Sequence, residues 1–159
     1  MARGGTPAIV ALTGAGVQFG VHEFENDPAE RGYGLAAANA LGVGPDRVFK
    51  TLIATVDETT HAVAIVPVSG QLSLKELAVA LGAKRAEMCD VQIAERLTGY
   101  VVGGISPFGQ KRPLPTVIDE TCILFDTIFV SGGRRGLDIE IAPDDLISVL
   151  SARTAPISV

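Results

Sequence analysis

The sequence predicts a single α+β (mixed α/β) domain over residues 1–159. The chain has the length of one ordinary domain, enough to bury a single sizeable core. With 47% hydrophobic and 19% charged residues, its composition is typical of a compact fold rather than a disordered chain. Short strand-like and helix-like segments follow one another in an irregular mixture of hairpins and helices, which favours the α+β class.

The chain up to residue 68 is expected to form two short helices, one strand and a hairpin. Thr6-Pro7 combines an N-cap with a first-turn proline, so AIVALTGAG should be a helix that its glycines stop. Residues 17–24 alternate as a strand does, and the alanine-rich run 35–41 predicts a helix. The β-rich runs 48–56 and 61–68, joined by the polar DETT, predict a hairpin.

The segment from residue 73 to residue 97 is expected to hold two helices with a strand between them. Ser73 and Glu76 fit a capping box, which predicts a helix through LAVALG. A short strand is expected around residues 86–88. Asp90 is then expected to cap a helix that runs through Leu97.

The last third of the chain is expected to be mainly β-structure. Short strands are predicted at residues 116–119, 127–130 and 137–141. SGGRRG should turn the chain between the last two. Pro143 should begin a closing helix, DDLISVL.

The stretch TGYVVGGISPFGQKRPLP, residues 98–115, is an apolar strand-like run followed by a proline-bent loop with a basic tip. Gly103 and Gly104 lack a Cβ, so they permit positive φ and close approach of the backbone to a ligand. Pro107 fixes its own φ and restricts Ser106. Such a loop can present backbone N–H groups to an ester carbonyl or a phosphate. The alternative interpretation is a tight turn between two strands.

Lys50 lies in FKTLIATV, a run that otherwise suits a buried strand. Lysine is rarely fully buried unless it is paired. Its side chain is therefore expected either to bind a phosphate or polarise a carbonyl at a pocket mouth, or to reach water from an edge strand. Thr51 should point to the opposite face of a regular strand, so the two cannot share a pocket without a bulge or strand end. Ser131 and Asp138 flank another Gly-rich turn, which is either a second pocket wall or only a hairpin.

The net charge of −5 argues against unaided tight binding to nucleic acid. Basic doublets at residues 84–85, 111–112 and 134–135 would form a phosphate-facing surface if the fold gathers them, and are otherwise scattered solubilising charges. No apolar run reaches the roughly 18 residues of a membrane span, and the N-terminus lacks a signal-peptide pattern. We expect a soluble, cytoplasmic protein with no membrane partner.

The sequence offers no convincing protein nucleophile or metal site. GISPFG is not a nucleophile elbow, and His22 and His61 have no nearby cysteine or metal-binding spacing. Cys89 and Cys122 lie in different elements and form no CxxC pair, so we expect reduced, buried small residues. No metal and no cofactor are expected.

Several ordered segments resemble the YbaK/EbsC family of aminoacyl-tRNA deacylases, and together they cover nearly the whole chain. They are Thr6-Pro7-Ala8, HEFENDP from His22, VFKTL, VPVSGQLSLKELAVALGAK, GYVVGGISPFGQK, LPTVID and VSGGRRGLDIEI. The resemblance is closest to the YbaK branch, the Cys-tRNA(Pro) deacylases related to the editing domain of bacterial prolyl-tRNA synthetases. It implies a mixed, partly barrel-like β-sheet with flanking helices.

The same resemblance implies trans editing, in which cysteine wrongly esterified to proline tRNA is hydrolysed to free cysteine and intact tRNA. The implied partners are the acceptor end of tRNA(Pro) and prolyl-tRNA synthetase. Two alternatives stay open: a deacylase for another small amino acid such as alanine or serine, and a non-catalytic module that binds tRNA ends or a synthetase.

Carried over position by position, the family lysine falls on Lys50 and the family glycine loop begins at Gly103, which makes these two the expected catalytic positions. The other expected substrate contacts are Phe24, Tyr33, Thr51, Gly104, Ile105, Ser106, Pro107, Ser131 and Asp138. Phe24 stands where the YbaK branch commonly has tyrosine, and Tyr33 where phenylalanine is common. An aminoacyl ester is already activated, so positioning and oxyanion stabilisation can suffice. The attacking group is water or, as the resemblance implies for cysteine, the substrate's own thiol, which we favour.

Overall fold

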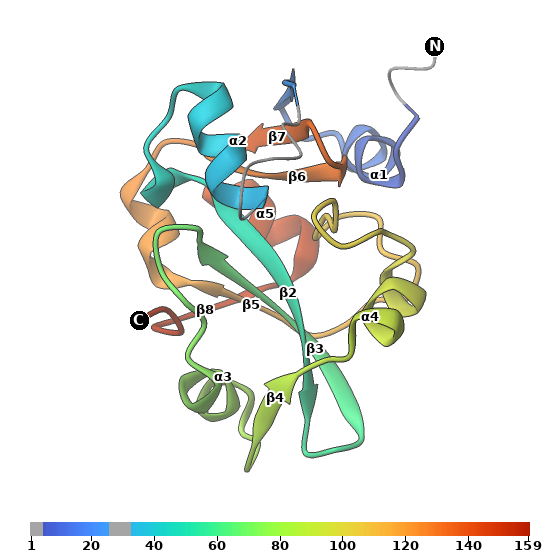
Figure 1. Ribbon diagram of the computed structural model, residues 1–159, viewed down its shortest axis with the longest axis vertical. Helices are drawn as coiled ribbons and strands as arrows, with labels where there is room; N and C mark the ends of the chain where they lie inside the picture. Colours follow the sequence, from blue (N-terminus) through green and yellow to red (C-terminus); the bar gives the residue numbers. More distant parts are fainter. Residues whose placement is uncertain (1–4, 26–32) are drawn as a thin grey trace.

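The computed structural model describes residues 5–25 and 33–159, and within these ranges the strands form two sheets (Figure 1). The smaller sheet has the order β1 (Phe19–Glu23), β7 (Leu137–Ile141) and β6 (Ile128–Arg134). The larger has the order β4 (Ala86–Met88), β2 (Phe49–Val56), β3 (Thr60–Pro67), β5 (Thr116–Asp119) and β8 (Arg153–Ala155). It is mixed, because β3, β5 and β8 run parallel while β2 is antiparallel to both of its neighbours. The expected α+β class is confirmed.

The β2–β3 hairpin forms the middle of the larger sheet, with Phe49 opposite Pro67 at its open end. On the other edge of β2, β4 pairs only with residues 54–56. Just before β2, Val48 forms an isolated parallel bridge with Phe129 of β6, and this bridge joins the two sheets. Among the described residues, the edge of β2 between the bridge and β4 therefore has no strand beside it.

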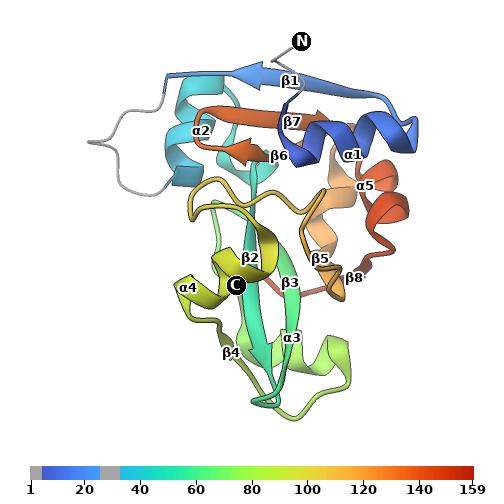
Figure 2. The same cartoon turned by 90° about the vertical axis from the view of Figure 1, so that its right-hand side faces the viewer.

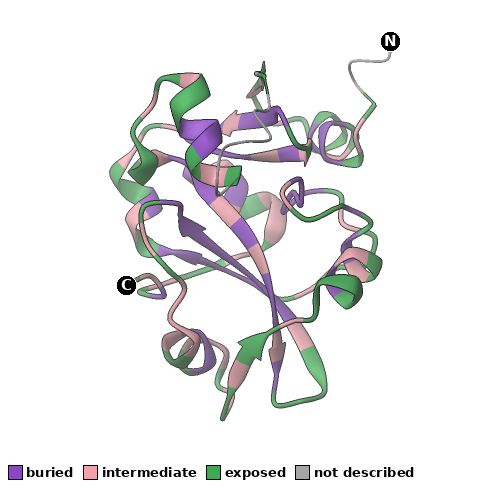
Figure 3. Ribbon diagram, in the orientation of Figure 1, coloured by how far each residue is buried: buried purple, intermediate pink, exposed green. Residues whose placement is uncertain are grey.

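The main hydrophobic core lies between the two sheets and is closed by α1 (Pro7–Ala15) and α5 (Pro143–Leu150) (Figure 2). Leu12 of α1 and Leu146 of α5 are fully buried there, with Ile65 of the larger sheet and Ile139 of the smaller one. Figure 3 shows this pattern as buried strands covered by helices that are exposed on their outer faces.

The other helices cover the remaining sheet faces and the join between the sheets. Leu77 of α3 (Leu74–Leu81) packs in a second core with Val66 of β3. Ala37 of α2 (Tyr33–Leu41) packs near the bridge between the sheets. The helix α4 (Val91–Thr98) leads into residues 99–115, which we call the central loop. Two 3-10 helices, η2 (Pro45–Arg47) and η3 (Glu120–Leu124), complete the described elements.

Local signals set most helix ends as expected. Thr6 Oγ1 accepts a hydrogen bond from the backbone N–H of Ile9 at 3.3 Å and begins α1. Ser73 Oγ accepts from the N–H of Glu76 at 3.2 Å and begins α3. Asp90 does precede α4, but its side chain makes no capping hydrogen bond, so the expected cap is wrong at that position.

The strand-like run expected after α4 is irregular backbone instead. The buried Tyr100 donates its hydroxyl to the carbonyl of Phe108 at 2.6 Å, which folds the run back on itself. The N–H of Lys111 also donates to Thr98 O at 2.9 Å and brings the two ends of the loop together. The turn expected over SGGRRG is shorter, because β6 continues with an irregularity to Arg134 before the turn.

Candidate functional site

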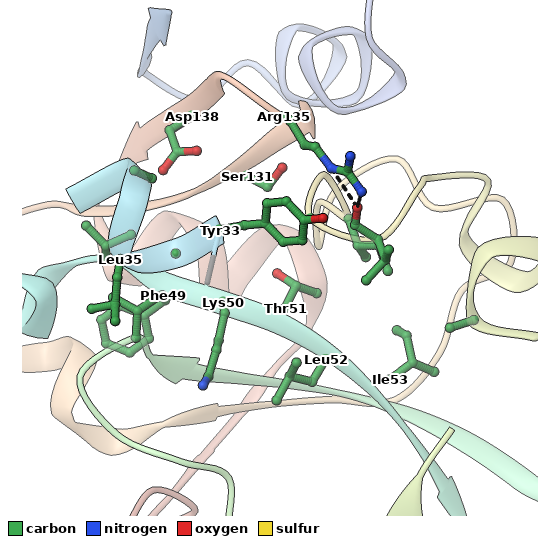
Figure 4. A pocket seen from close by; sticks show the side chains of 18 of the residues that line it. Tyr33, Leu35, Phe49, Lys50, Thr51, Leu52, Ile53, Ser131, Arg135 and Asp138 are labelled. Atoms are coloured by element: carbon green, nitrogen blue, oxygen red, sulfur yellow. Dashed lines mark hydrogen bonds between the residues drawn. The ribbon is translucent and has the colours of Figure 1, made fainter. Parts of the chain in front are cut away.

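A cavity of about 330 Å³ opens beside β2, between α2, the β4–α4 segment, the central loop and the β6–β7 hairpin (Figure 4). Its size is at the lower end of the roughly 300–1,000 Å³ typical of small-ligand sites. Its wall is mainly apolar, with Ile53, Ala94 and Ile105 among its members. The polar groups in the wall are few, and most of them belong to the expected site residues.

The cavity brings together eight of the eleven expected site residues, although they are far apart in the sequence. These are Phe24, Tyr33, Lys50, Thr51, Gly103, Ile105, Ser131 and Asp138. Gly104, Ser106 and Pro107 are buried within the central loop and do not line the cavity. Ser106 Oγ accepts from the N–H of Phe108 at 3.2 Å and stabilises the loop backbone.

Lys50 is a half-buried cation at the cavity, and among the described residues it forms no ion pair. Burial lowers the pKa of its ammonium group, because the charged form loses water. A cation without a protein counter-ion is able to bind a ligand phosphate or ester oxygen.

Thr51 carries a hydroxyl without a hydrogen-bond partner in the part of the chain that the structure describes. Its side chain is 8% exposed and lines the same cavity. A buried polar group left unpaired costs about 1–3 kcal/mol. This hydroxyl is thus available to a ligand.

Ser131 and Asp138 lie directly opposite each other on β6 and β7, so their side chains share one face of the smaller sheet. Ser131 Oγ accepts from the N–H of Gly133 at 3.2 Å. Asp138 is only 6% exposed, and burial raises the pKa of its carboxyl group to about 7. The group is therefore partly protonated near neutral pH and can donate as well as accept a hydrogen bond.

The two loop glycines are required by packing. Gly103 has φ of +87°, and a Cβ there would lie 2.7 Å from both Arg135 Nε and Tyr33 Cδ2. A Cβ on Gly104 would lie 2.7 Å from the Cα of Arg134. The first glycine therefore leaves room for cavity side chains, and the second leaves room for the β6 backbone.

Among the cavity residues that were not expected, Arg135 and Cys89 carry an ionisable side chain. The sequence shows Arg135 only as part of a basic doublet, because nothing in its local pattern indicates that it reaches α2 and the central loop. Cys89 is a free thiol in the wall, and it is half-buried where a buried residue was expected. Burial raises the pKa of this thiol above its ordinary value, which disfavours the nucleophilic thiolate.

The basic doublets do not form one surface. Asp57 Oδ1, in the β2–β3 turn, accepts from the backbone N–H of Arg85 at 2.9 Å, so that doublet lies at the hairpin tip. The Arg134–Arg135 doublet lies at the β6–β7 turn, at the opposite end of the molecule (Figure 1). Arg134 also pairs with Glu23 at 2.6 Å, which reduces its availability for a phosphate.

Within residues 5–25 and 33–159, no group of three or more His, Cys, Asp or Glu side chains is placed to hold a metal ion. Over the same ranges, none of the helices is both long and apolar enough to span a bilayer.

The half-buried cation, the unpaired hydroxyl and the apolar wall are chemically compatible with a small ligand that carries an anionic or carbonyl oxygen. The family model for the aminoacyl-tRNA editing domain matches residues 32–149, and the chain belongs to that family. Editing deacylases act on mischarged aminoacyl-tRNA, and the relatives of this chain are of the YbaK/EbsC type.

A curated relative from Enterococcus faecalis (strain ATCC 700802 / V583) is provisionally named a Cys-tRNA(Pro)/Cys-tRNA(Cys) deacylase, EbsC. It is 39% identical over 123 residues, which cover 77% of this chain and 75% of the relative. The crystal structure of a hypothetical protein matches with a TM-score of 0.85 at 21% identity, over 96% of this chain and 99% of that one. The structure of a provisionally assigned trans-editing enzyme for prolyl-tRNA synthetase matches with a TM-score of 0.78 at 22% identity, over 89% and 87% of the two chains. At such identities these two structures establish the fold alone.

Proposed function

We propose that this protein hydrolyses cysteine wrongly esterified to tRNA(Pro), in trans to prolyl-tRNA synthetase. The observation that carries the proposal is the small cavity that places Lys50, Thr51 and Gly103 around one apolar space. The name of the relative at 39% identity supports cysteine as the amino acid that is removed.

The proposed roles follow from charge and geometry. Lys50 binds the phosphate or ester oxygen of the terminal nucleotide. The backbone N–H groups of the loop at Gly103 stabilise the oxyanion that forms at the ester carbonyl. Hydrogen bonds from Thr51, Ser131 and Asp138 hold the amino acid and the ribose. The ring of Tyr33 packs against these two parts of the substrate.

The chemistry needs no protein nucleophile, because the aminoacyl ester is already activated. In the proposed step, the substrate's cysteine sulfur forms a bond to its own carbonyl carbon, and the ester C–O bond breaks. The thiol proton ends on the ribose oxygen of the released tRNA. Water then opens the cyclic thioester to give free cysteine. Burial raises the pKa of the Cys89 thiol, which is consistent with a passive wall residue rather than a competing nucleophile.

The decisive experiment incubates purified protein with a panel of charged tRNAs. The panel contains Cys-tRNA(Pro), Cys-tRNA(Cys), Ala-tRNA(Pro), Ser-tRNA(Pro) and Pro-tRNA(Pro). We expect cysteine to be released faster than alanine, serine or proline, and at similar rates from tRNA(Pro) and tRNA(Cys) when no synthetase is present. Preferred release of alanine or serine would identify the alternative small-residue deacylase, and binding without any release would identify a non-catalytic module.

The substrate-thiol step has its own test. Cysteine whose thiol is blocked by S-methylation, esterified to the same tRNA, should be released at least about tenfold more slowly. Equal rates for the methylated and the free thiol would identify water as the attacking group.

A further inference from the structure

Arg135, at the turn between β6 and β7, reaches across the cavity rim to two other segments (Figure 4). Its Nε and Nη2 both donate to the backbone carbonyl of Val102, at 3.1 and 2.7 Å. Its guanidinium carbon lies 4.4 Å from the centre of the Tyr33 ring. One side chain therefore contacts both the central loop and α2.

The contact with Val102 fixes the peptide that links this residue to Gly103. A trans peptide is planar, so its C=O and N–H groups point in opposite directions. When Arg135 holds the carbonyl of Val102 on one side, the N–H of Gly103 must point to the other side. The orientation of a potential oxyanion donor is thus set by an arginine outside the loop.

The fit among these three segments depends on glycine. A Cβ on Gly103 would lie 2.7 Å from Arg135 Nε and the same distance from Tyr33 Cδ2. The space that glycine leaves is therefore the space in which the arginine and the tyrosine stack.

We propose that Arg135 is a positioning residue, which orients the Val102–Gly103 peptide and holds Tyr33 against the same wall of the cavity. This inference rests on the proposed deacylase function, in which that peptide faces the reacting ester. Arg135 is exposed, so its hydrogen bonds add little to global stability. Replacement of Arg135 should therefore change the conformation of the loop and leave the overall fold intact.

The proposed role of Arg135 depends on the planar guanidinium group with its two N–H donors, and not on positive charge alone. Lysine keeps the charge and can still interact with the tyrosine ring, but it lacks the rigid pair of N–H donors that converge on one carbonyl oxygen. Arg135→Lys should therefore lose nearly as much deacylation activity as Arg135→Ala.

The test measures kcat and KM for Cys-tRNA(Pro) in wild type, Arg135→Ala and Arg135→Lys. Arg153→Ala is the matched control, because Arg153 is also exposed and donates to a backbone carbonyl, that of Ala80 at 2.8 Å. We expect kcat to fall about 10- to 100-fold in both Arg135 variants, KM to change less, and the control to match wild type. Full activity of Arg135→Lys, or a loss confined to KM that becomes smaller as the salt concentration rises, would overturn positioning and indicate a phosphate contact.

A second measurement does not depend on turnover. In ¹⁵N–¹H spectra of the full chain, the amide resonance of Gly103 should shift in Arg135→Ala, and its order parameter should fall, while the control spectrum stays unchanged there. An unaltered Gly103 amide would overturn the inference even if wild type deacylates. Conversely, a wild type inactive on every charged tRNA would overturn the proposed function, and the Gly103 amide would still decide whether Arg135 positions the loop.

Discussion

Lys50 and Thr51 are consecutive residues of β2, and their side chains leave the strand on opposite faces, yet both line the same cavity (Figure 4). The sequence led us to expect that a bulge or a strand end would be needed for this. The pairing of β2 with β3 is regular at these residues. The cavity instead lies at the open edge of β2, where β4 does not reach, and so meets both faces.

Replacement of Lys50 by alanine should abolish most deacylation while the protein folds normally. Burial lowers the pKa of this ammonium group, so the charged form reduces the free energy of unfolding at every pH below that pKa. Removal of the charge should therefore leave thermal stability equal or higher at pH 7, and kcat/KM should fall about 100-fold or more.

The control for Lys50 is Lys75→Ala, which removes an exposed lysine of α3. Turnover of Cys-tRNA(Pro) and the melting temperature of both variants are compared with wild type. Turnover of Lys50→Ala equal to that of the control would remove Lys50 from the mechanism.

Replacement of Thr51 by valine should lower activity without loss of stability. The valine keeps the shape and removes a hydroxyl that has no partner in the described structure. Thr116→Val is the contrasting variant, because the hydroxyl of this buried threonine donates to Leu114 O at 3.1 Å. Urea unfolding should show Thr116→Val less stable by about 1 kcal/mol and Thr51→Val unchanged or more stable. Equal destabilisation of the two would mean that the Thr51 hydroxyl is already satisfied without substrate.

The parts of the fold that the sequence predicted are those that short-range chemistry determines. The Thr6 cap, the Ser73 capping box and the β2–β3 hairpin depend on residues a few positions apart. The alternating pattern of residues 137–141 likewise predicted β7 with its correct bounds.

The parts that were not predicted depend on tertiary contacts. β8 has three residues and exists because it pairs with β5, whose partner residues lie over 30 positions earlier in the chain. Tyr100 is in a run with strand propensity, but its buried hydroxyl bonds to Phe108 and imposes a loop. The place of Arg135 in the site depends on α2 and the central loop together, so no local pattern could indicate it.

Replacement of Gly103 by alanine should reduce deacylation through a local clash. The new Cβ would meet Arg135 and Tyr33 at 2.7 Å, on a residue with φ of +87°. Gly82→Ala is a matched control, because Gly82 has φ of +68° and no atom within 4 Å of the position of a Cβ. It carries the backbone strain without the clash. Steady-state kinetics should show a large loss only for Gly103→Ala, whereas similar activity of both variants would show that the loop is only a turn.

Replacement of Asp138 by asparagine should flatten the dependence of stability on pH. Burial raises the pKa of this carboxyl group from 3.8 to about 7, so the folded state retains a proton that the unfolded state has lost. The stabilising contribution is full below pH 3.8 and is lost as pH rises through about 7. From pH 5 to 8 this loss is at most about 3 kcal/mol. Urea unfolding at several pH values should show that the free energy of unfolding falls with rising pH in wild type and falls less in Asp138→Asn. If the two proteins show the same dependence of unfolding free energy on pH, the Asp138 carboxyl group does not retain a proton in the folded state.

The final prediction concerns tRNA choice, and it follows from the mismatch between an acidic chain and a polyanionic substrate. The net charge is −5 and the pI is near 5.0. The Arg134 side chain already pairs with Glu23, and the 84–85 doublet lies at the far end of the molecule from the 134–135 doublet. In the part of the chain that the structure describes, Lys111 and Arg112 form the third basic doublet, and we expect this small basic group to contribute weakly to holding the tRNA body.

The isolated protein should therefore bind tRNA weakly and remove cysteine from several tRNAs at rates within about a factor of five, with strong dependence on salt. Addition of prolyl-tRNA synthetase should make hydrolysis selective for tRNA(Pro), because the tRNA-binding surface of the synthetase would supply the contacts that this chain lacks. The measurement compares deacylation of cysteine on tRNA(Pro), tRNA(Cys) and tRNA(Ala), with and without the synthetase. Strong discrimination by the isolated protein would contradict this division of roles, because an acidic domain with dispersed basic residues would then be reading the tRNA by itself.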